Sequence, residues 1–405
     1  MSSLASTAAR ASLAGAPVHL PRGAAAAAPL LAVEGLEVAF PHGQRGWVPV
    51  VLGASLAVRR GECVGLVGES GSGKSLTALA VLRLVPPPGR VRGRVLLDGR
   101  DLPVAASGVR RPASRAARRA EAAMRAVRGA GIGIVFQEPM TALNPFYTIG
   151  FQIAEAVAAH RAIGRRAARA EAVRLLERVA IPDARRRLAD YPHQLSGGQR
   201  QRALLAMALA GGPEVLLADE PTTALDVTLQ AQVLALLDEL RHDLGLAMLL
   251  ITHDLAVVAE TCDRVAVLYA GQVVEEAGVA DLFRAPAHPY TRGLLATLPR
   301  LGQGAARGRL PVLAGQPAEP AARPAGCAFH PRCPEAMPVC AVEEPPETGT
   351  WPPAAAVAGA PPRRVRCWLH ALPAGSGKAA TAAMRAGEGL AGAGTGGAAP
   401  ADGGR

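Results

Sequence analysis

Short apolar runs alternate with amphipathic stretches along most of the chain. Four continuous apolar runs, bounded by turn residues, occupy 63–67, 215–218, 248–252 and 265–268. Runs of this length without polar alternation are typical of strands buried on both faces of a sheet. Between them lie longer stretches with helical spacing, of which 228–244 is the clearest. Strands that alternate with helices predict an α/β domain with a largely parallel sheet.

The pattern changes in three parts of the chain. Residues 138–210 are mostly helical in pattern and rich in arginine, which predicts a helical subdomain inserted into a domain that spans 30–285. After residue 285 proline becomes frequent and periodicity fades, so 286–370 is expected to form a separate extension. The two ends, 1–29 and 371–405, contain much alanine and few bulky apolar residues, and we expect a disordered leader and a disordered tail.

The distribution of basic and apolar residues bears on whether the chain binds nucleic acid or spans a membrane. The chain has 405 residues with 44 Lys+Arg against 33 Asp+Glu, and all basic residues except Lys74 and Lys378 are arginine. Arginines concentrate in 110–128, within a stretch, 101–130, whose function the sequence leaves open. No aromatic residues interleave with them, as a binder of single-stranded nucleic acid would need, which favours a solvated surface helix over a phosphate-binding patch. No run reaches the length of about 18 apolar residues that a membrane-spanning helix needs, so any action at a membrane requires partners.

A glycine-rich loop follows the first buried run. It reads Gly68, Glu69, Ser70, Gly71, Ser72, Gly73, Lys74, Ser75, and a helical pattern begins directly afterwards. This is the phosphate-binding loop pattern in its strand-loop-helix setting, where glycines let consecutive backbone N–H groups converge on one anion. Lys74 is expected to reach the β- and γ-phosphates of a nucleotide, and Ser75 to bind Mg²⁺.

Two acids end the second buried run. Asp219 and Glu220 follow 215–218 directly. A carboxylate at a strand end can hold Mg²⁺, and its neighbour can orient or deprotonate an attacking water. Paired with the phosphate loop, this combination predicts nucleotide hydrolysis.

Further motifs resemble those of the ATP-binding-cassette (ABC) ATPases. Leu195, Ser196, Gly197, Gly198 and Gln199, followed by Arg200, Gln201 and Arg202, match the signature sequence of that class. Gln137 matches its Q-loop, the run from Ala224 to Asp226 its D-loop, and His253 its switch histidine. All these motifs occur once and in the order that the family has.

The resemblance implies a site shared between two chains. The phosphate loop of one ATPase and Ser196, Gly197 and Gly198 of another would enclose one ATP. It also implies that Asp219 joins Ser75 on Mg²⁺, that Gln137 senses the γ-phosphate, that Glu220 is the general base and that His253 stabilises the transferring phosphoryl group. For stacking on adenine we expect Phe40, with Trp47 as the alternative.

A narrower resemblance covers residues 31–370. The segments 138–155, 191–202 and especially 287–299 (AHPYTRGLLATLP) look like those of oligopeptide and dipeptide importer ATPases. This implies a peripheral subunit on the cytoplasmic face of a bacterial inner membrane. Its implied partners are two permeases, a second and paralogous ATPase and, indirectly, an extracytoplasmic solute-binding protein, with no nucleic acid. Import of nickel or another small solute, or a soluble role in DNA repair or on ribosomes, are the alternatives.

Four late cysteines remain unexplained by nucleotide chemistry. Cys327, Cys333, Cys340 and Cys367 are separated by five, six and 26 residues, a spacing unlike the close pairs of most zinc sites. Disulfides are disfavoured in a cytosolic protein. Some peptide-importer ATPases carry a [4Fe-4S] cluster at a similar array, which the resemblance makes the first expectation here, with zinc and no metal as alternatives. The two other cysteines, Cys63 and Cys262, stand singly in apolar, strand-like stretches, which is not the pattern of a secreted disulfide scaffold.

Overall fold

The computed structural model describes residues 28–43, 46–104, 114–137, 142–223, 225–298, 312–349 and 363–371. Most of the predicted leader and tail therefore lies outside the described residues, as do Arg110, Arg111 and Ala224. Within the described part of the chain, no helix is both long and apolar enough to cross a membrane.

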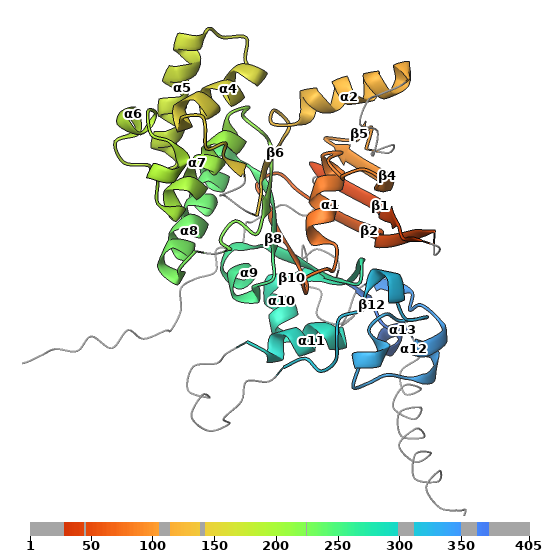
Figure 1. Ribbon diagram of the computed structural model, residues 1–405. Coiled ribbons are helices and arrows are strands. Elements are labelled where there is room, and N and C mark those ends of the chain that lie inside the picture. Colours follow the sequence, from red (N-terminus) through yellow and green to blue (C-terminus); the bar gives the residue numbers. More distant parts are fainter. Residues whose placement is uncertain are drawn as a thin grey trace, which may run out of the picture.

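The centre of the molecule is an eight-stranded sheet (Figure 1). Its strands, in spatial order, are β11 (Glu347–Gly349), β12 (Arg364–Arg366), β10 (Gln272–Gly278), β9 (Arg264–Tyr269), β3 (Cys63–Val67), β8 (Ala247–Thr252), β7 (Val215–Asp219) and β6 (Ile132–Val135). The strands from β9 to β6 are parallel, whereas β10, β12 and β11 pair antiparallel. The four predicted buried runs form β3, β7, β8 and β9, and every residue of these strands is buried. The predicted α/β class is thus confirmed.

A second, antiparallel sheet packs beside the first. Its order is β2 (Trp47–Val58), β1 (Leu31–Pro41), β4 (Arg90–Leu97) and β5 (Arg100–Leu102). Buried positions alternate with partly exposed ones along much of β1, as expected for a sheet with one covered face. Helix α1 (Lys74–Val81) lies between the two sheets, and one apolar cluster includes residues from both of them and from α1.

Helices form the opposite side of the molecule (Figure 1). They are α4 (Ile149–His160), α5 (Arg165–Arg178), α6 (Ala184–Arg187), the short turn η2 (Pro192–Gln194), α7 (Gly197–Leu209) and α8 (Val227–Leu244). A single apolar cluster joins them to the central sheet. Helix α2 (Arg115–Val127) lies apart from this group, and Met124 is its only buried residue, which confirms the predicted solvated surface helix.

The C-terminal residues complete the central sheet. Helices α9 (Leu255–Thr261), α10 (Val279–Arg284) and α11 (Pro289–Ala296) are followed by the short elements η3 (Pro320–Ala322), η4 (His330–Arg332), α12 (Pro338–Val342) and α13 (Trp368–Ala371). The carboxylate of Glu275 on β10 is fully buried. It accepts hydrogen bonds from the backbone N–H groups of Ala287 (2.8 Å) and His288 (2.9 Å) and pairs with Arg363 at 2.6 Å. Residues on both sides of position 285 therefore share one sheet.

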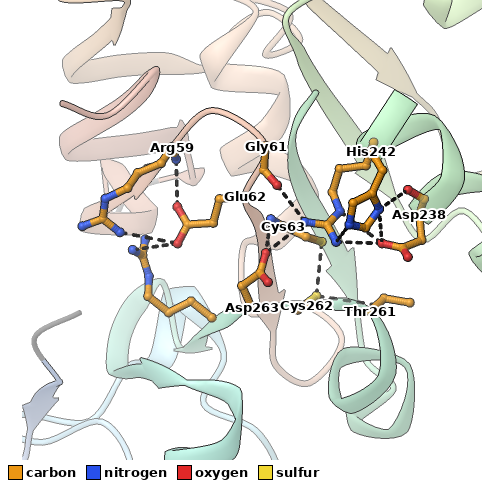
Figure 2. A network of polar contacts seen from close by, with 11 residues as sticks. Arg59, Gly61, Glu62, Cys63, Asp238, His242, Thr261, Cys262 and Asp263 are labelled. Atoms are coloured by element: carbon orange, nitrogen blue, oxygen red, sulfur yellow. Dashed lines mark hydrogen bonds and ion pairs between the residues drawn. The ribbon is translucent and has the colours of Figure 1, made fainter. Parts of the chain in front are cut away.

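A polar network fixes the start of β3 (Figure 2). The buried Arg241 of α8 donates to the carbonyl oxygen of Gly61 (2.7 Å) and to Asp263 Oδ2 (3.2 Å). The same Asp263 oxygen accepts the backbone N–H of Cys63 at 2.8 Å. Cys63 and Cys262, which are far apart along the chain, meet here as free thiols. Cys63 Sγ donates a hydrogen bond to Cys262 Sγ at 3.5 Å, because α9 ends beside the start of β3. This hydrogen bond and, after it, burial raise the pKa of Cys63.

Candidate nucleotide site

The phosphate loop connects β3 to α1 at the edge of the sheet where the parallel strands end. Gly71 and Gly73 have φ angles of +80° and +103°, which side chains disfavour. A Cβ atom on Gly68 would overlap the carbonyl oxygen of Leu268 in the neighbouring strand β9. The glycines are therefore required by backbone conformation at two positions and by close packing at the third.

Lys74 points back into this loop. Its Nζ donates to the carbonyl oxygens of Gly68 (2.8 Å) and Glu69 (3.1 Å). Burial lowers the pKa of Lys74, and the charges of Glu220, Asp219 and Glu69 act in the opposite direction. The ammonium group is thus held inside a loop whose shape suits phosphate, and the nearby carboxylates oppose the effect of burial on its pKa.

Ser75 and Asp219 meet across the sheet edge. Ser75 Oγ donates to Asp219 Oδ1 at 3.0 Å. Burial raises the pKa of Asp219, whereas the Ser75 hydrogen bond lowers it. A hydroxyl beside a carboxylate is an oxygen donor set of the kind that Mg²⁺ takes next to a nucleotide phosphate. The two residues fit the predicted magnesium site.

The carboxylate of Glu220 is contacted by side chains that follow the two strands beside its own. Its Oε2 accepts hydrogen bonds from Gln137 Nε2 (3.0 Å) and Thr223 Oγ1 (2.8 Å). Its Oε1 lies 3.3 Å from His253 Nδ1. Gln137 follows β6, Glu220 follows β7 and His253 follows β8, so the parallel sheet brings the three together. Glu220 also has a φ angle of +46°, an uncommon conformation for a residue with a side chain.

Thr223 is a residue that the sequence reasoning missed. Its hydroxyl donates to the Glu220 carboxylate, and so helps to fix it. It stands three positions after Glu220 in a turn with no periodic pattern. The only available signal was this short separation, which allows a threonine to bond back to the acid.

The signature residues cap a helix. Ser196 Oγ accepts the backbone N–H of Gln199 (3.3 Å), and Gln199 Oε1 accepts that of Ser196 (3.1 Å), at the start of α7. Asp226 caps α8, where its Oδ1 accepts the backbone N–H of Leu229 (2.9 Å). Within the described residues, no hydrogen bond or ion pair joins 196–199 to the phosphate loop. The structure thus presents the start of α7, with Gly197 and Gly198, apart from Lys74.

The two aromatic candidates lie on the antiparallel sheet. Phe40 is half-buried on β1 and packs against the apolar cluster around α1. Trp47 on β2 is exposed, and the guanidinium of Arg90 lies 3.5 Å from its ring centroid.

The late cysteines converge on one cavity. Cys327, Cys333, Cys340 and Cys367 all line it, together with the side chain of Phe329 and a few neighbours. All four are free thiols. Burial raises the pKa of Cys327, that of Cys333 to about 11 and that of Cys367 to about 12. Among the described residues, no group of three or more ligand side chains is already arranged around a metal position.

The two histidines near these cysteines differ in position. His330 lines the cavity, and its Nδ1 lies 2.9 Å from the carbonyl oxygen of Cys327. His370 Nε2 instead lies 3.1 Å from the carbonyl oxygen of Ala287.

The loop, the paired acids and the oriented glutamate define a P-loop nucleoside triphosphate hydrolase. Residues 51–223 match the family described as ABC transporter, and residues 274–340 match the oligopeptide/dipeptide transporter C-terminal region. The chain belongs to the ABC transporter ATP-binding proteins of the oligopeptide/dipeptide importer family. The resemblance found in the sequence is confirmed, and with it the prediction of an ATP-binding and ATP-hydrolysing subunit.

Similar proteins agree over most of the chain. A putative peptide import ATP-binding protein of Brucella abortus (strain 2308) is 49% identical over 327 residues, which are 78% of this chain and 93% of that protein. A probable peptide ABC transporter ATP-binding protein of Sinorhizobium fredii (strain NBRC 101917 / NGR234) is 48% identical over 77% of this chain and 89% of its own length.

Solved structures resemble the cassette. The dimeric ATP-binding cassette MJ0796, in a post-hydrolysis state with ADP and Pi, is 27% identical with a TM-score of 0.51. It covers 62% of this chain and 98% of its own. The protein cbiO1 of Clostridium perfringens is 26% identical with the same TM-score of 0.51, over 64% of this chain and 91% of its own.

Proposed function

We propose that this chain powers the import of dipeptides, oligopeptides or related small solutes from the cytoplasmic face of a bacterial inner membrane. The observation that carries this proposal is the C-terminal region, residues 274–340, which matches the oligopeptide/dipeptide transporter family. The names of the similar proteins, which describe peptide import, support it. The chain would be a peripheral subunit beneath two permeases.

The geometry supports a division of roles at the nucleotide. Lys74 exchanges its two loop carbonyls for β- and γ-phosphate oxygens, because these carry more negative charge. Ser75 and Asp219 would hold Mg²⁺, which neutralises charge on the same phosphates. Glu220 accepts the proton of the attacking water.

Three neighbours support Glu220 in that role. The hydrogen bonds from Gln137 and Thr223 hold one carboxylate oxygen, which leaves the other to face His253 and a water. Gln137 also reports the presence of the γ-phosphate to the permease. His253 stabilises charge on the transferring phosphoryl group.

A second ATPase chain completes the site. Ser196, Gly197 and Gly198 at the start of α7 contact the ATP held by the phosphate loop of a paralogous partner. The N-terminus of a helix suits this task because its free N–H groups attract phosphate. ATP binding then closes the pair and hydrolysis reopens it, while a solute-binding protein delivers solute to the permeases on the other side.

Co-purification tests the assembly. The tagged chain is isolated from detergent-solubilised membranes, and the proteins that accompany it are identified. We expect two permeases and a second ATPase. Recovery only from the soluble fraction, with ribosomes or nucleic acid attached, would reject the transport role.

A transport assay then tests the solute. Cells with and without the chain are compared for uptake of a labelled dipeptide, a labelled pentapeptide and labelled nickel. Peptide uptake that depends on the chain supports peptide import, whereas nickel uptake alone would assign the assembly to the other solute class.

We also propose that Cys327, Cys333, Cys340 and Cys367 hold a [4Fe-4S] cluster. Four free thiols line one cavity, which supplies the number and kind of ligands that the cluster needs. The raised pKa values of Cys333 and Cys367 mean that these thiols stay protonated without metal, so binding releases protons and strengthens as pH rises.

Metal analysis tests this second proposal. The protein is purified without oxygen and assayed for iron, acid-labile sulfide, zinc and visible absorbance. Iron and sulfide in equal amounts, lost in Cys333→Ser and retained in Cys262→Ser, are expected. Zinc without iron, or no metal, would reject the cluster. Cys262→Ser is a suitable control because its thiol contacts Cys63 and lies outside the cavity.

A further inference from the structure

The C-terminal region holds the second residue of the phosphate loop. Arg332, on the short element η4, forms a bidentate ion pair with Glu69: Nη1 lies 2.6 Å from Oε2 and Nη2 lies 2.9 Å from Oε1. The Arg332 side chain is 4% exposed and that of Glu69 is 24% exposed. Two parallel charge-assisted hydrogen bonds in a largely buried place give a strong and well-oriented contact.

Tyr290 holds the backbone of the same residue. Its hydroxyl oxygen accepts the N–H of Glu69 at 2.9 Å. Tyr290 is fully buried, and its ring lies 4.6 Å from that of Tyr269 and 5.3 Å from that of Phe329, measured between centroids. A packed aromatic cluster therefore fixes the position of the hydroxyl, and both the main chain and the side chain of Glu69 are bound by C-terminal residues.

The charge of Glu69 matters to the nucleotide. Glu69 belongs to the loop that surrounds the phosphates, and its carbonyl oxygen accepts a hydrogen bond from Lys74 Nζ at 3.1 Å. An unpaired carboxylate there would repel the polyphosphate chain, since ATP carries several negative charges. The guanidinium of Arg332 neutralises this carboxylate from the side of the C-terminal region.

We propose that Arg332 is a positioning residue of the nucleotide site, which sets the affinity for ATP by neutralising Glu69 and, with Tyr290, by holding the phosphate loop. The C-terminal region thereby acts on ATP binding within its own chain. Arg332 acts through Glu69 and not by contact with the nucleotide. This effect on ATP binding does not depend on which solute is carried.

Substitutions separate charge from packing. In Arg332→Met the apolar stem is kept and Glu69 is left without its cation. We expect the Kd and KM for MgATP to rise about tenfold and kcat to change less than about twofold. The reason is that the lost neutralisation of Glu69 affects the binding of ATP and not its hydrolysis. Arg332→Lys keeps the charge but loses the paired geometry, and an increase of about threefold is expected.

The double variant Glu69→Gln/Arg332→Met is the decisive one. Because it removes the carboxylate that Arg332 neutralises, we expect the Kd to return to within about threefold of the unsubstituted chain. Tyr290→Phe, which leaves the Glu69 amide without its acceptor, should raise the Kd about threefold to fivefold.

The measurement is equilibrium binding of MgATP to the full-length chain, with steady-state ATP hydrolysis for KM and kcat. Arg292→Met is the matched control: it removes another ion pair of the C-terminal region, with Glu335 at 2.7 Å, which does not include Glu69. Thermal unfolding shows that each variant is folded.

Two results would overturn the proposal. One is an Arg332→Met chain that binds MgATP as tightly as the unsubstituted chain or as the Arg292→Met control. The other is a double variant that binds as weakly as Arg332→Met alone, because neutralising Glu69 would then have no effect.

Discussion

Replacing Glu220 by glutamine is the sharpest test of the hydrolysis site. The side chain of Glu220 is 12% exposed, and its carboxylate has three neighbours: Gln137 at 3.0 Å, Thr223 at 2.8 Å and His253 at 3.3 Å. Glutamine has the same shape, so these neighbours can stay in place. It is neutral and cannot accept a proton from water, so the variant removes the base and little else.

The expected loss of hydrolysis rate in Glu220→Gln follows from the role of a general base. Such groups contribute about 10²-fold to 10⁴-fold in rate, or roughly 3 to 5 kcal/mol of the activation barrier. ATP binding responds differently. The charge of Glu220 acts on Lys74 within the same site, so its loss removes repulsion toward the phosphates. A repulsion of about 1 kcal/mol between two charges corresponds to a factor of about five in affinity, so the Kd for MgATP should stay the same or fall by up to about fivefold.

Phosphate release and equilibrium binding of MgATP measure the two effects separately. Glu214→Gln is the matched control, because Glu214 precedes the same strand β7 at its opposite end and pairs with the exposed Arg60. Its hydrolysis should equal that of the unsubstituted chain. If Glu220→Gln retains more than about a tenth of the rate, Glu220 is not the base. If it loses ATP binding as well, the assignment of separate roles is wrong.

Three further substitutions test other parts of the structure. Gly68→Ala should abolish MgATP binding in an equilibrium assay, because its Cβ would overlap the carbonyl oxygen of Leu268; binding within about twofold of normal would contradict this. Arg363→Met should lower the free energy of unfolding by about 3 to 5 kcal/mol, measured by urea titration, since it leaves the fully buried carboxylate of Glu275 without its cation; Glu275→Gln/Arg363→Met should lose less. Burial lowers the pKa of His288 to about 3 from 6.5. The unfolded chain therefore binds a proton that the folded chain does not between these values, and stability present above pH 6.5 is lost as pH falls toward 3. His288→Asn should make unfolding less dependent on pH in that range by up to about 1.4 kcal/mol per pH unit, and equal slopes for both chains would show that His288 does not titrate as stated.

The sequence predicted the residues whose chemistry depends on neighbours along the chain. A phosphate loop needs glycines, a lysine and a serine at fixed local spacing between a strand and a helix, so it can be recognised without a tertiary structure. The same is true of Asp219 and Glu220 at a strand end. Parallel strands then place Gln137, Glu220 and His253 at one edge, which follows from topology alone.

Tertiary structure alone decided the contacts between distant segments. Arg332 and Glu69 are 263 positions apart, and Cys63 and Cys262 are 199 apart. No periodicity relates such pairs. The addition of β12 and β11 to the central sheet, and the meeting of four cysteines in one cavity, likewise depend on where the chain returns after long connections.

The physical reason is the range of the interactions. Backbone conformation, helix capping and strand burial depend on residues a few positions apart, and they leave a pattern that can be read locally. Ion pairs and packed clusters between segments depend on three-dimensional proximity, which many sequences satisfy with different residues. In this protein, local sequence motifs identify the residues of the ATPase site. The contact of the C-terminal region with the phosphate loop, in contrast, can be recognised only in the folded chain.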